Sequence, residues 1–332
     1  MPPRAGAVAR VVATPEGAAT AAAATAETSP ATGPASAAPV LACATLLAAA
    51  GLLLPATASA QPGREHGQGI TPVYEGYVEK PDGSFDLLFG YLNRNWAEQP
   101  VIEIGPDNFL DPGGPDLGQP THFLPRRNRF VFRVPVPADF GRGEVVWTLT
   151  VNGVTAQAFG TLRQGYAVDD TVLMANFGGG GQGGFRPDTV GNRAPALAIE
   201  TARELTAAVG EPLTLRAVAT DDGKPSRRPI PDRWIGRNRS VLFAATGLRL
   251  SWIRYRGPAP VAFDPPQTKV WEDYRDGGGS PWSAGWEPPP IPPENRWTVR
   301  ATFSAPGTYV LRCIAHDGGL QTYEDVTVRV HP

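Results

Sequence analysis

The feature that most constrains the fold is a period-two alternation of apolar residues in short segments separated by turn residues. The segment RFVFRVPVP shows it most clearly, with apolar side chains at Phe130, Phe132, Val134 and Val136. Successive side chains of a β-strand point to opposite faces, so this spacing predicts a strand with one buried face. The chain of 332 residues also holds 38 Gly and 36 Pro, enough for many turns. We therefore predict an all-β fold.

Two further segments of the N-terminal half follow the same rule. In SFDLLFGYLN one face carries Phe85, Leu87, Phe89 and Tyr91. In EVVWTLTV one face carries Val145, Trp147, Leu149 and Val151. The dipeptide Asn152-Gly153 comes next and is a strong hairpin signal. We expect residues 61–175 to form an antiparallel β-sandwich domain.

A glycine-rich segment, residues 176–193, follows this half. A phosphate-binding loop would need Gly-Lys-Ser/Thr at the start of a helix, and a dinucleotide fingerprint would need a flanking βαβ unit. Neither pattern is present, so the composition predicts a flexible linker. The predicted architecture is two β-sandwich domains in tandem, with the second at residues 194–332.

The C-terminal half carries a chain of motifs. It begins with Asn192-Arg-Ala-Pro, continues with GEPLTL, DDG and a Leu-x-Trp strand, and ends with APGTY and an Asp-Gly turn. Over residues 192–330, apart from two insertions, it resembles the PKD-type Ig-like domain of bacterial secreted or surface proteins. The resemblance implies a seven-strand sandwich that spaces or contacts without catalysis. The N-terminal half loosely resembles β domains of uncharacterised secreted bacterial proteins, which implies no function.

The cysteine content restricts the chemistry. Of the two cysteines, Cys43 lies in an N-terminal apolar segment and Cys313 in the penultimate predicted strand. Alternation places Cys313 on one face with Tyr309, Leu311 and Ala315. We therefore interpret Cys313 as a small buried apolar residue, since a reactive thiol needs exposure and a lowered pKa.

The first sixty residues are not expected to belong to the fold. Residues 1–39 are rich in Ala and Pro and are predicted to be disordered. Residues 40–60 read VLACATLLAAAGLLLPATASA, an apolar run followed by Pro55 and an Ala-Ser-Ala end. This pattern predicts a signal peptide cleaved after Ala60, and hence export to the periplasm, the cell surface or the medium. The alternative is an uncleaved membrane anchor at residues 40–60.

Few residues suggest catalysis or a cofactor. The histidines, His66, His122, His316 and His331, have no metal-ligand spacing, and no nucleophile elbow is present. The formal net charge of −2 gives no reason to expect nucleic acid or strong membrane binding. Asp221, Asp222 and Asp317 offer oxygen ligands for calcium if their turns converge, but ordinary turn chemistry is the favoured interpretation. We predict no catalytic residue, no metal site and no cofactor.

Two insertions interrupt the second domain. The first is basic, with Arg227, Arg228, Arg233, Arg237 and Arg239, and suits an anionic glycan or lipid. The second, residues 271–297, is rich in Trp, Pro and Gly. Its predicted ligand-binding residues are Trp282, Trp286 and Tyr274, because exposed aromatic rings supply contact area to sugars. Trp271 and Trp297, at the loop roots, are expected to be buried anchors. Alternatively, all these tryptophans only fasten the loop to the sandwich.

The function predicted from these observations is a secreted or cell-surface, non-enzymatic β protein that acts as a binding or spacer module. The expected partner is a glycan or a component of the cell envelope, with its identity open. One alternative is a carbohydrate-binding accessory protein that uses the tryptophan-rich loop. A second is a hydrolase, which would place clustered acidic or histidine side chains in a cleft.

Overall fold

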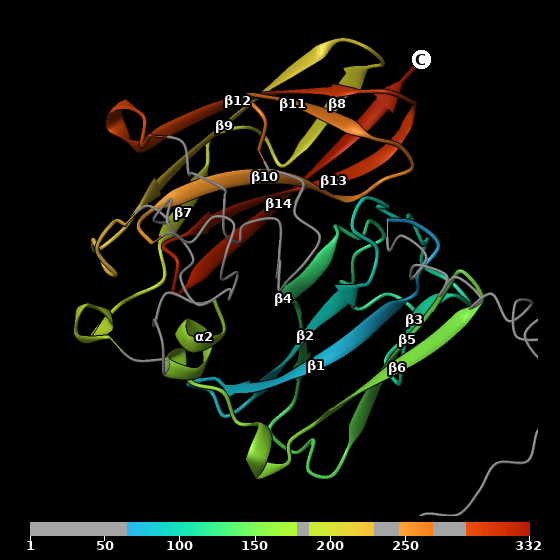
Figure 1. Ribbon diagram of the computed structural model, residues 1–332, viewed down its shortest axis with the longest axis vertical. Coiled ribbons are helices and arrows are strands. Elements are labelled where there is room, and N and C mark those ends of the chain that lie inside the picture. The colour runs from blue at the N-terminus through green and yellow to red at the C-terminus, as the bar shows by residue number, and fades with distance from the viewer. Residues whose placement is uncertain (1–64, 178–185, 229–245, 268–289) are drawn as a thin grey trace, which may run out of the picture. The chain divides into compact units, whose positions relative to one another are not determined.

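The computed structural model describes residues 65–177, 186–228, 246–267 and 290–332. The N-terminal half contains β1 (Ile70–Glu79), β2 (Phe85–Asn93), β3 (Asn108–Asp111), β4 (Arg126–Val136), β5 (Glu144–Val151) and β6 (Val154–Thr161). These strands form two three-stranded antiparallel sheets, in the orders β1-β2-β4 and β3-β5-β6 (Figure 1). The predicted all-β fold is confirmed for the part of the chain that the structure describes.

The core of the N-terminal half lies between its two sheets and is built on aromatic rings. Trp147 is fully buried and meets Phe132 edge-on at 5.0 Å between ring centroids. Phe89 stacks on Phe132 at 5.3 Å. Leu87, Tyr91 and the alternate residues of β5 complete the cluster. The faces predicted for β2 and β5 are therefore confirmed, because these strands alternate without interruption.

Phe130 departs from the face predicted for it. Its φ of 51° lies in the left-handed region, and the β2–β4 register shifts between Phe89 and Tyr91, opposite this residue. This irregularity turns Phe130 out of the main core. The side chain instead joins a smaller buried cluster formed by Leu88, Val168, Leu173, Met174 and Leu320. Leu173 and Met174 belong to a helix, α2 (Asp170–Phe177), that the alternation had not predicted.

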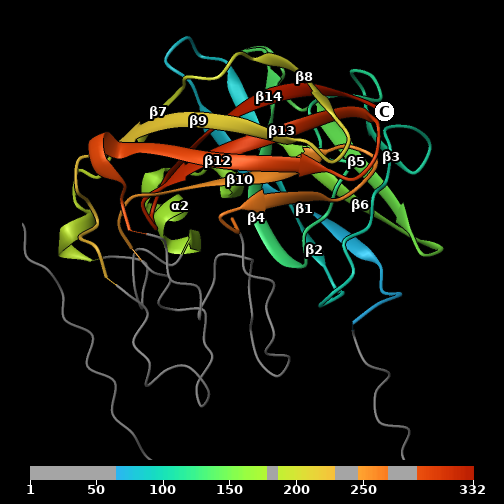
Figure 2. The ribbon, with the colours of Figure 1, turned by 90° about the horizontal axis from the view of Figure 1, so that it is seen from above.

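The C-terminal half forms a larger sandwich. Its strands are β7 (Ala196–Ile199), β8 (Glu204–Ala208), β9 (Pro212–Thr220), β10 (Arg249–Arg256), β11 (Val261–Asp264), β12 (Arg296–Phe303), β13 (Gly307–His316) and β14 (Gln321–His331). They form four-stranded sheets in the orders β11-β12-β9-β7 and β10-β13-β14-β8, with β9 beside β12 in Figure 2. Three 3₁₀ turns, η2 (Gln164–Tyr166), η3 (Pro187–Thr189) and η5 (Pro293–Asn295), complete the described elements.

This strand order is that of an Ig-like sandwich. It has eight strands rather than the seven that the resemblance implies, because the first is divided between the sheets. β7 pairs antiparallel with β9 in one sheet, and β8 pairs parallel with β14 in the other. The chain thus changes sheet within its first strand, and the two parts of this strand form the edge strands of both sheets on that side.

The core of this sandwich confirms the interpretation of Cys313. Trp252 on β10 is opposite Cys313 on β13, and both are fully buried. Burial raises the pKa of the thiol well above its usual range. The Tyr309 hydroxyl donates a hydrogen bond to the carbonyl of Ala305 at 2.8 Å, in the manner of an Ig tyrosine corner. Cys313 therefore acts as a core residue with no thiolate character.

The described residues of the two halves form one compact unit. Seven of the eight residues of β10 are buried, so this strand is covered on both faces rather than on one. Its inner face packs in the sandwich core, and segments of the N-terminal half cover its outer face. None of the helices in the described part of the chain has the length and apolar character needed to cross a membrane.

Candidate functional site

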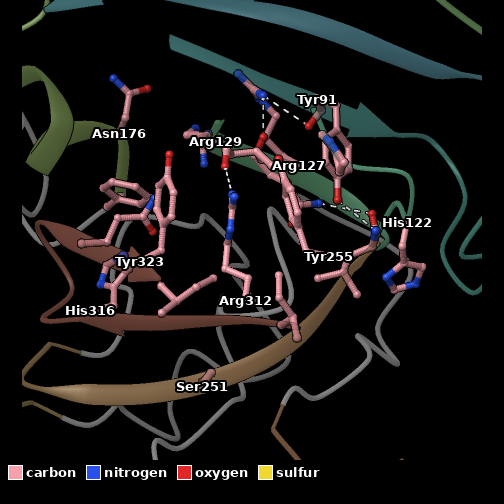
Figure 3. Close-up of a pocket in the computed structure, with 18 of the residues that line it drawn as sticks. Tyr91, His122, Arg127, Arg129, Asn176, Ser251, Tyr255, Arg312, His316 and Tyr323 are labelled. Atoms are coloured by element: carbon pink, nitrogen blue, oxygen red, sulfur yellow. Dashed lines mark hydrogen bonds between the residues drawn. The ribbon is translucent and has the colours of Figure 1, made fainter. Parts of the chain in front are cut away.

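A small cavity lies where the outer face of the β10-β13-β14 sheet meets β4 (Figure 3). Its volume is about 80 Å³, and its walls include Val131, Ile253 and Ile314 together with several arginine and tyrosine side chains. Alternation explains which residues face it. Because Cys313 points into the core of the sandwich, its neighbours Arg312 and Ile314 point into this cavity.

Arg312 is the central residue of the cavity. Its guanidinium forms two hydrogen bonds with Asp325, from Nε to Oδ1 at 2.7 Å and from Nη2 to Oδ2 at 2.8 Å. The remaining Nη1 donates to the carbonyl of Val131 on β4. Figure 3 shows the side chain standing between Tyr255 and Tyr323, and its Cζ lies 3.5 Å and 4.0 Å from their ring centroids. The charge and the plane of Arg312 therefore fix its side chain within the C-terminal half, and its bond to Val131 joins the halves.

A second set of contacts joins residues 116–122 of the N-terminal half to the end of β10. The Tyr255 hydroxyl donates to the carbonyl of Gly118. Arg256 forms a bidentate pair with Asp116 at 2.8 Å and 2.9 Å. His122 Nδ1 lies 2.8 Å from the carbonyl oxygen of Arg254. These bonds satisfy backbone and side-chain groups at an edge strand that would otherwise be open.

The two histidines near the cavity are held neutral. Burial, followed by the charge of Arg249, lowers the pKa of His316 well below its usual value. His316 Nδ1 accepts a hydrogen bond from the backbone N–H of Gly318 at 2.6 Å, and its ring meets Phe177 at 4.7 Å. Burial, with the charge of Arg254, lowers the pKa of His122 to about 3. Neither imidazole is tuned for proton transfer near neutral pH.

Carboxylates do not line this cavity or its neighbour on β10. The clustered acidic groups expected of a hydrolase are therefore not found in these two cavities. A general acid–base pair requires two titratable groups within reach of one substrate, with pKa values suited to proton transfer. The cavity holds cations and phenols, of which Arg312 and Tyr255 form hydrogen bonds between the halves.

The three aspartates considered for calcium act as turn acceptors. Asp317 is fully buried, and its carboxylate accepts N–H groups from Leu320 at 2.7 Å and from the side chain of Asn192 at 3.1 Å. Burial raises the pKa of Asp317 to about 6. Asp221 and Asp222 each accept the backbone N–H two residues ahead at 2.9 Å. Within the four described ranges, no three His, Cys, Asp or Glu residues are placed to hold a metal ion.

The predicted ligand-binding aromatic residues lie outside the described residues. These are Tyr274, Trp282 and Trp286, and the predicted anchor Trp271 lies there too. The other anchor, Trp297 on β12, is only 8 % exposed, so its predicted burial is confirmed. From the basic insertion, Arg228 is described and pairs with Asp188 at 2.8 Å. Arg227 is also described, whereas Arg233, Arg237 and Arg239 are not.

The residues that join the halves were not identified from the sequence. A signal was available, because Arg312 lies between the core residues Leu311 and Cys313, and the other residues from Val310 to Ala315 are apolar. In an isolated sandwich domain such a position faces solvent, where an arginine is common and does not indicate an interface. Its burial at 4 % exposure shows that the outer face of this sheet is an interface.

Comparison with known proteins gave structural neighbours only. No protein-family model and no curated protein matches the chain. Domains 4 and 5 of the S-layer protein SbsC match with 11% identity and a TM-score of 0.22, over 60% of this chain and 69% of that one. The fibronectin(III)-like modules of Clostridium thermocellum CbhA match with 9% identity and a TM-score of 0.21, over 79% and 94%. Immunoglobulin domains 1–4 of Sidekick-1 match with 10% identity and a TM-score of 0.21, over 79% and 48%.

Proposed function

We propose that this protein is an exported, non-enzymatic β protein whose two halves act as one rigid binding or spacer module. The observation that carries the proposal is the junction around Arg312. A buried guanidinium that bonds to both halves and stacks on two phenol rings cannot move without losing partners in a low-dielectric site. A spacer needs this property, because its length and direction depend on a fixed joint.

Two further observations support the non-enzymatic part of the proposal. Burial keeps the imidazoles of His122 and His316 neutral, and neither described cavity on β10 is lined by a carboxylate. The net charge of −2 disfavours nucleic acid as the partner. A glycan or a cell-envelope component stays the proposed partner. The use of Tyr274, Trp282 and Trp286 to bind it stays a prediction.

Spin labels test the rigid joint. Cysteines introduced in a Cys43→Ser background at two exposed positions, Glu144 on β5 and Thr298 on β12, place one label in each half, and buried Cys313 should not react. If the joint is rigid, pulsed electron paramagnetic resonance should give one narrow distribution of distances between the two labels. The same pair with Arg312→Ala should give a broader one. A broad distribution in the parent protein would refute the rigid joint.

Export is tested separately. The apolar run and the Ala58-Ser59-Ala60 end predict that the exported protein begins at Gln61, which N-terminal sequencing reads directly. Recovery of the intact N-terminus from the cytoplasm alone would contradict export. Recovery of an intact N-terminus from the membrane would support the uncleaved anchor instead.

A further inference from the structure

A second cavity, of about 390 Å³, opens between the edges of the C-terminal sandwich. β10 and β11 are the end strands of its two sheets, and residues of both line the cavity. Its walls are polar and apolar in about equal measure, and the apolar part includes Leu124, Val261 and Phe263. Its polar lining includes His122 and Arg254. A cavity of this size that combines apolar side chains with a few polar groups can hold a small molecule.

Arg254 is a buried cation without a partner. The side chain is only 7 % exposed, yet no ion pair or side-chain hydrogen bond joins it to any residue in the described ranges. Its Nη1 is fully enclosed without an acceptor. Two other arginines of this interface differ, since Arg312 pairs with Asp325 and Arg256 with Asp116. Burial lowers the pKa of Arg254, and the nearby Tyr309 and the charge of Glu103 offset this only in part, so the enclosed guanidinium is incompletely compensated and its retention requires a reason.

Trp252 supplies a second unused donor in the same wall. It lies two residues before Arg254 on β10, so both side chains point to the same side of the strand. Its indole Nε1 is buried with no hydrogen-bond acceptor. The matching core tryptophan of the N-terminal half, Trp147, donates to Asn108 Oδ1 at 3.0 Å. A buried donor without an acceptor is unfavourable, so this wall of the cavity contains two residues with an unsatisfied donor.

We infer that this cavity binds a small organic carboxylate. The fork of guanidinium N–H groups on Arg254 matches the two oxygens of a carboxylate. Val261 and Phe263 supply contact for an apolar or aromatic body, which distinguishes the ligand from an inorganic anion. His122 does not compete for the anion, because its Nδ1 bonds to the Arg254 carbonyl and its Nε2 to Gln99. This inference rests on the proposed binding function, to which it adds a class of ligand.

Calorimetric titration of the purified protein at low salt tests this inference. Benzoate is the probe, benzamide is its neutral isostere, and inorganic phosphate is an anion without an apolar body. We expect benzoate to bind and both other compounds to bind at least about 10-fold more weakly, because a hydrogen bond to a charged group contributes about 1.5–3 kcal/mol. Equal binding of phosphate would overturn the organic class. No heat with benzoate or with hexanoate would overturn the site.

Substitutions assign the binding to this cavity. Arg254→Met and Arg254→Gln should weaken benzoate binding by about 10-fold or more. Arg216→Met removes an exposed arginine of β9 and should leave the affinity unchanged. Without ligand, Arg254→Met should raise the melting temperature, whereas replacing an arginine with a structural role would lower it. Unchanged affinity in both Arg254 variants would refute the site.

Nuclear magnetic resonance offers a readout that does not depend on the variants. Arg254 acts electrostatically on the His122 ring, so a carboxylate bound to Arg254 should shift the ring signals of His122. Benzamide should leave them in place. Binding heat without any change at His122 would place benzoate elsewhere. None of these measurements depends on export or on the joint, so failure here is distinguishable from failure of the rigid-module proposal.

Discussion

Replacing Arg312 with alanine should destabilise the folded protein more than replacing any other single arginine of the C-terminal sheets. The change removes two bonds to Asp325, one to the Val131 carbonyl, and stacking on Tyr255 and Tyr323. Breaking a buried charge pair costs about 3–5 kcal/mol, and desolvated cation–π contacts reach about 2 kcal/mol. The Asp325 side chain is 38% exposed and regains water, so we expect a total loss of about 3–4 kcal/mol.

Urea unfolding measured by circular dichroism gives this difference in the free energy of unfolding. Arg329→Ala is the matched control, because Arg329 on β14 pairs with Glu204 at an exposed site and should contribute less than about 1 kcal/mol. Arg312→Lys should restore only part of the stability, since an ammonium group cannot form the bidentate pair. A loss for Arg312→Ala no larger than that of the control would refute the view that this residue holds the halves together.

Three further predictions concern Cys313, His122 and the tryptophans of the second insertion. Cys313 should react slowly with a thiol reagent in the native protein and rapidly after denaturation, and Cys313→Ser should cost about 1–3 kcal/mol; rapid native labelling would contradict its burial. Burial lowers the pKa of His122 in the folded state to about 3, so the unfolded state binds the proton first as the pH falls below about 6.5. The free energy of unfolding therefore falls as the pH falls from about 6.5 to about 3, by about 1.4 kcal/mol per pH unit at most. Urea titrations should show a smaller loss for His122→Gln than for the parent protein between pH 7 and pH 5. Equal losses in the two proteins would refute the role of His122. Trp297→Ala should lower stability by about 3–5 kcal/mol, whereas Trp282→Ala combined with Trp286→Ala should weaken glycan binding and leave the melting temperature nearly unchanged; core-like unfolding of the double variant would remove that candidate surface.

The local alternation of apolar residues was sufficient to predict the strands and their buried faces. Alternation placed Trp147 and Cys313 in the two cores, and both are fully buried. The dipeptide Asn152-Gly153 predicted a hairpin, and both residues have positive φ, at 51° and 74°. These features depend on residues adjacent in the chain, and for that reason they can be predicted without a structure.

The tertiary structure decided which outer faces meet. A strand's alternation separates two faces but does not say whether the second meets water or another sheet. Arg312 therefore gave no indication of burial, and the bulge that turns Phe130 toward α2 depends on its pairing with β2. Both cavities follow from the same long-range contacts, because residues far apart in the chain line them. The sequence by itself determined two sets of strands and their cores; the packing of one sandwich on the other determined the buried arginines and the cavities beside them.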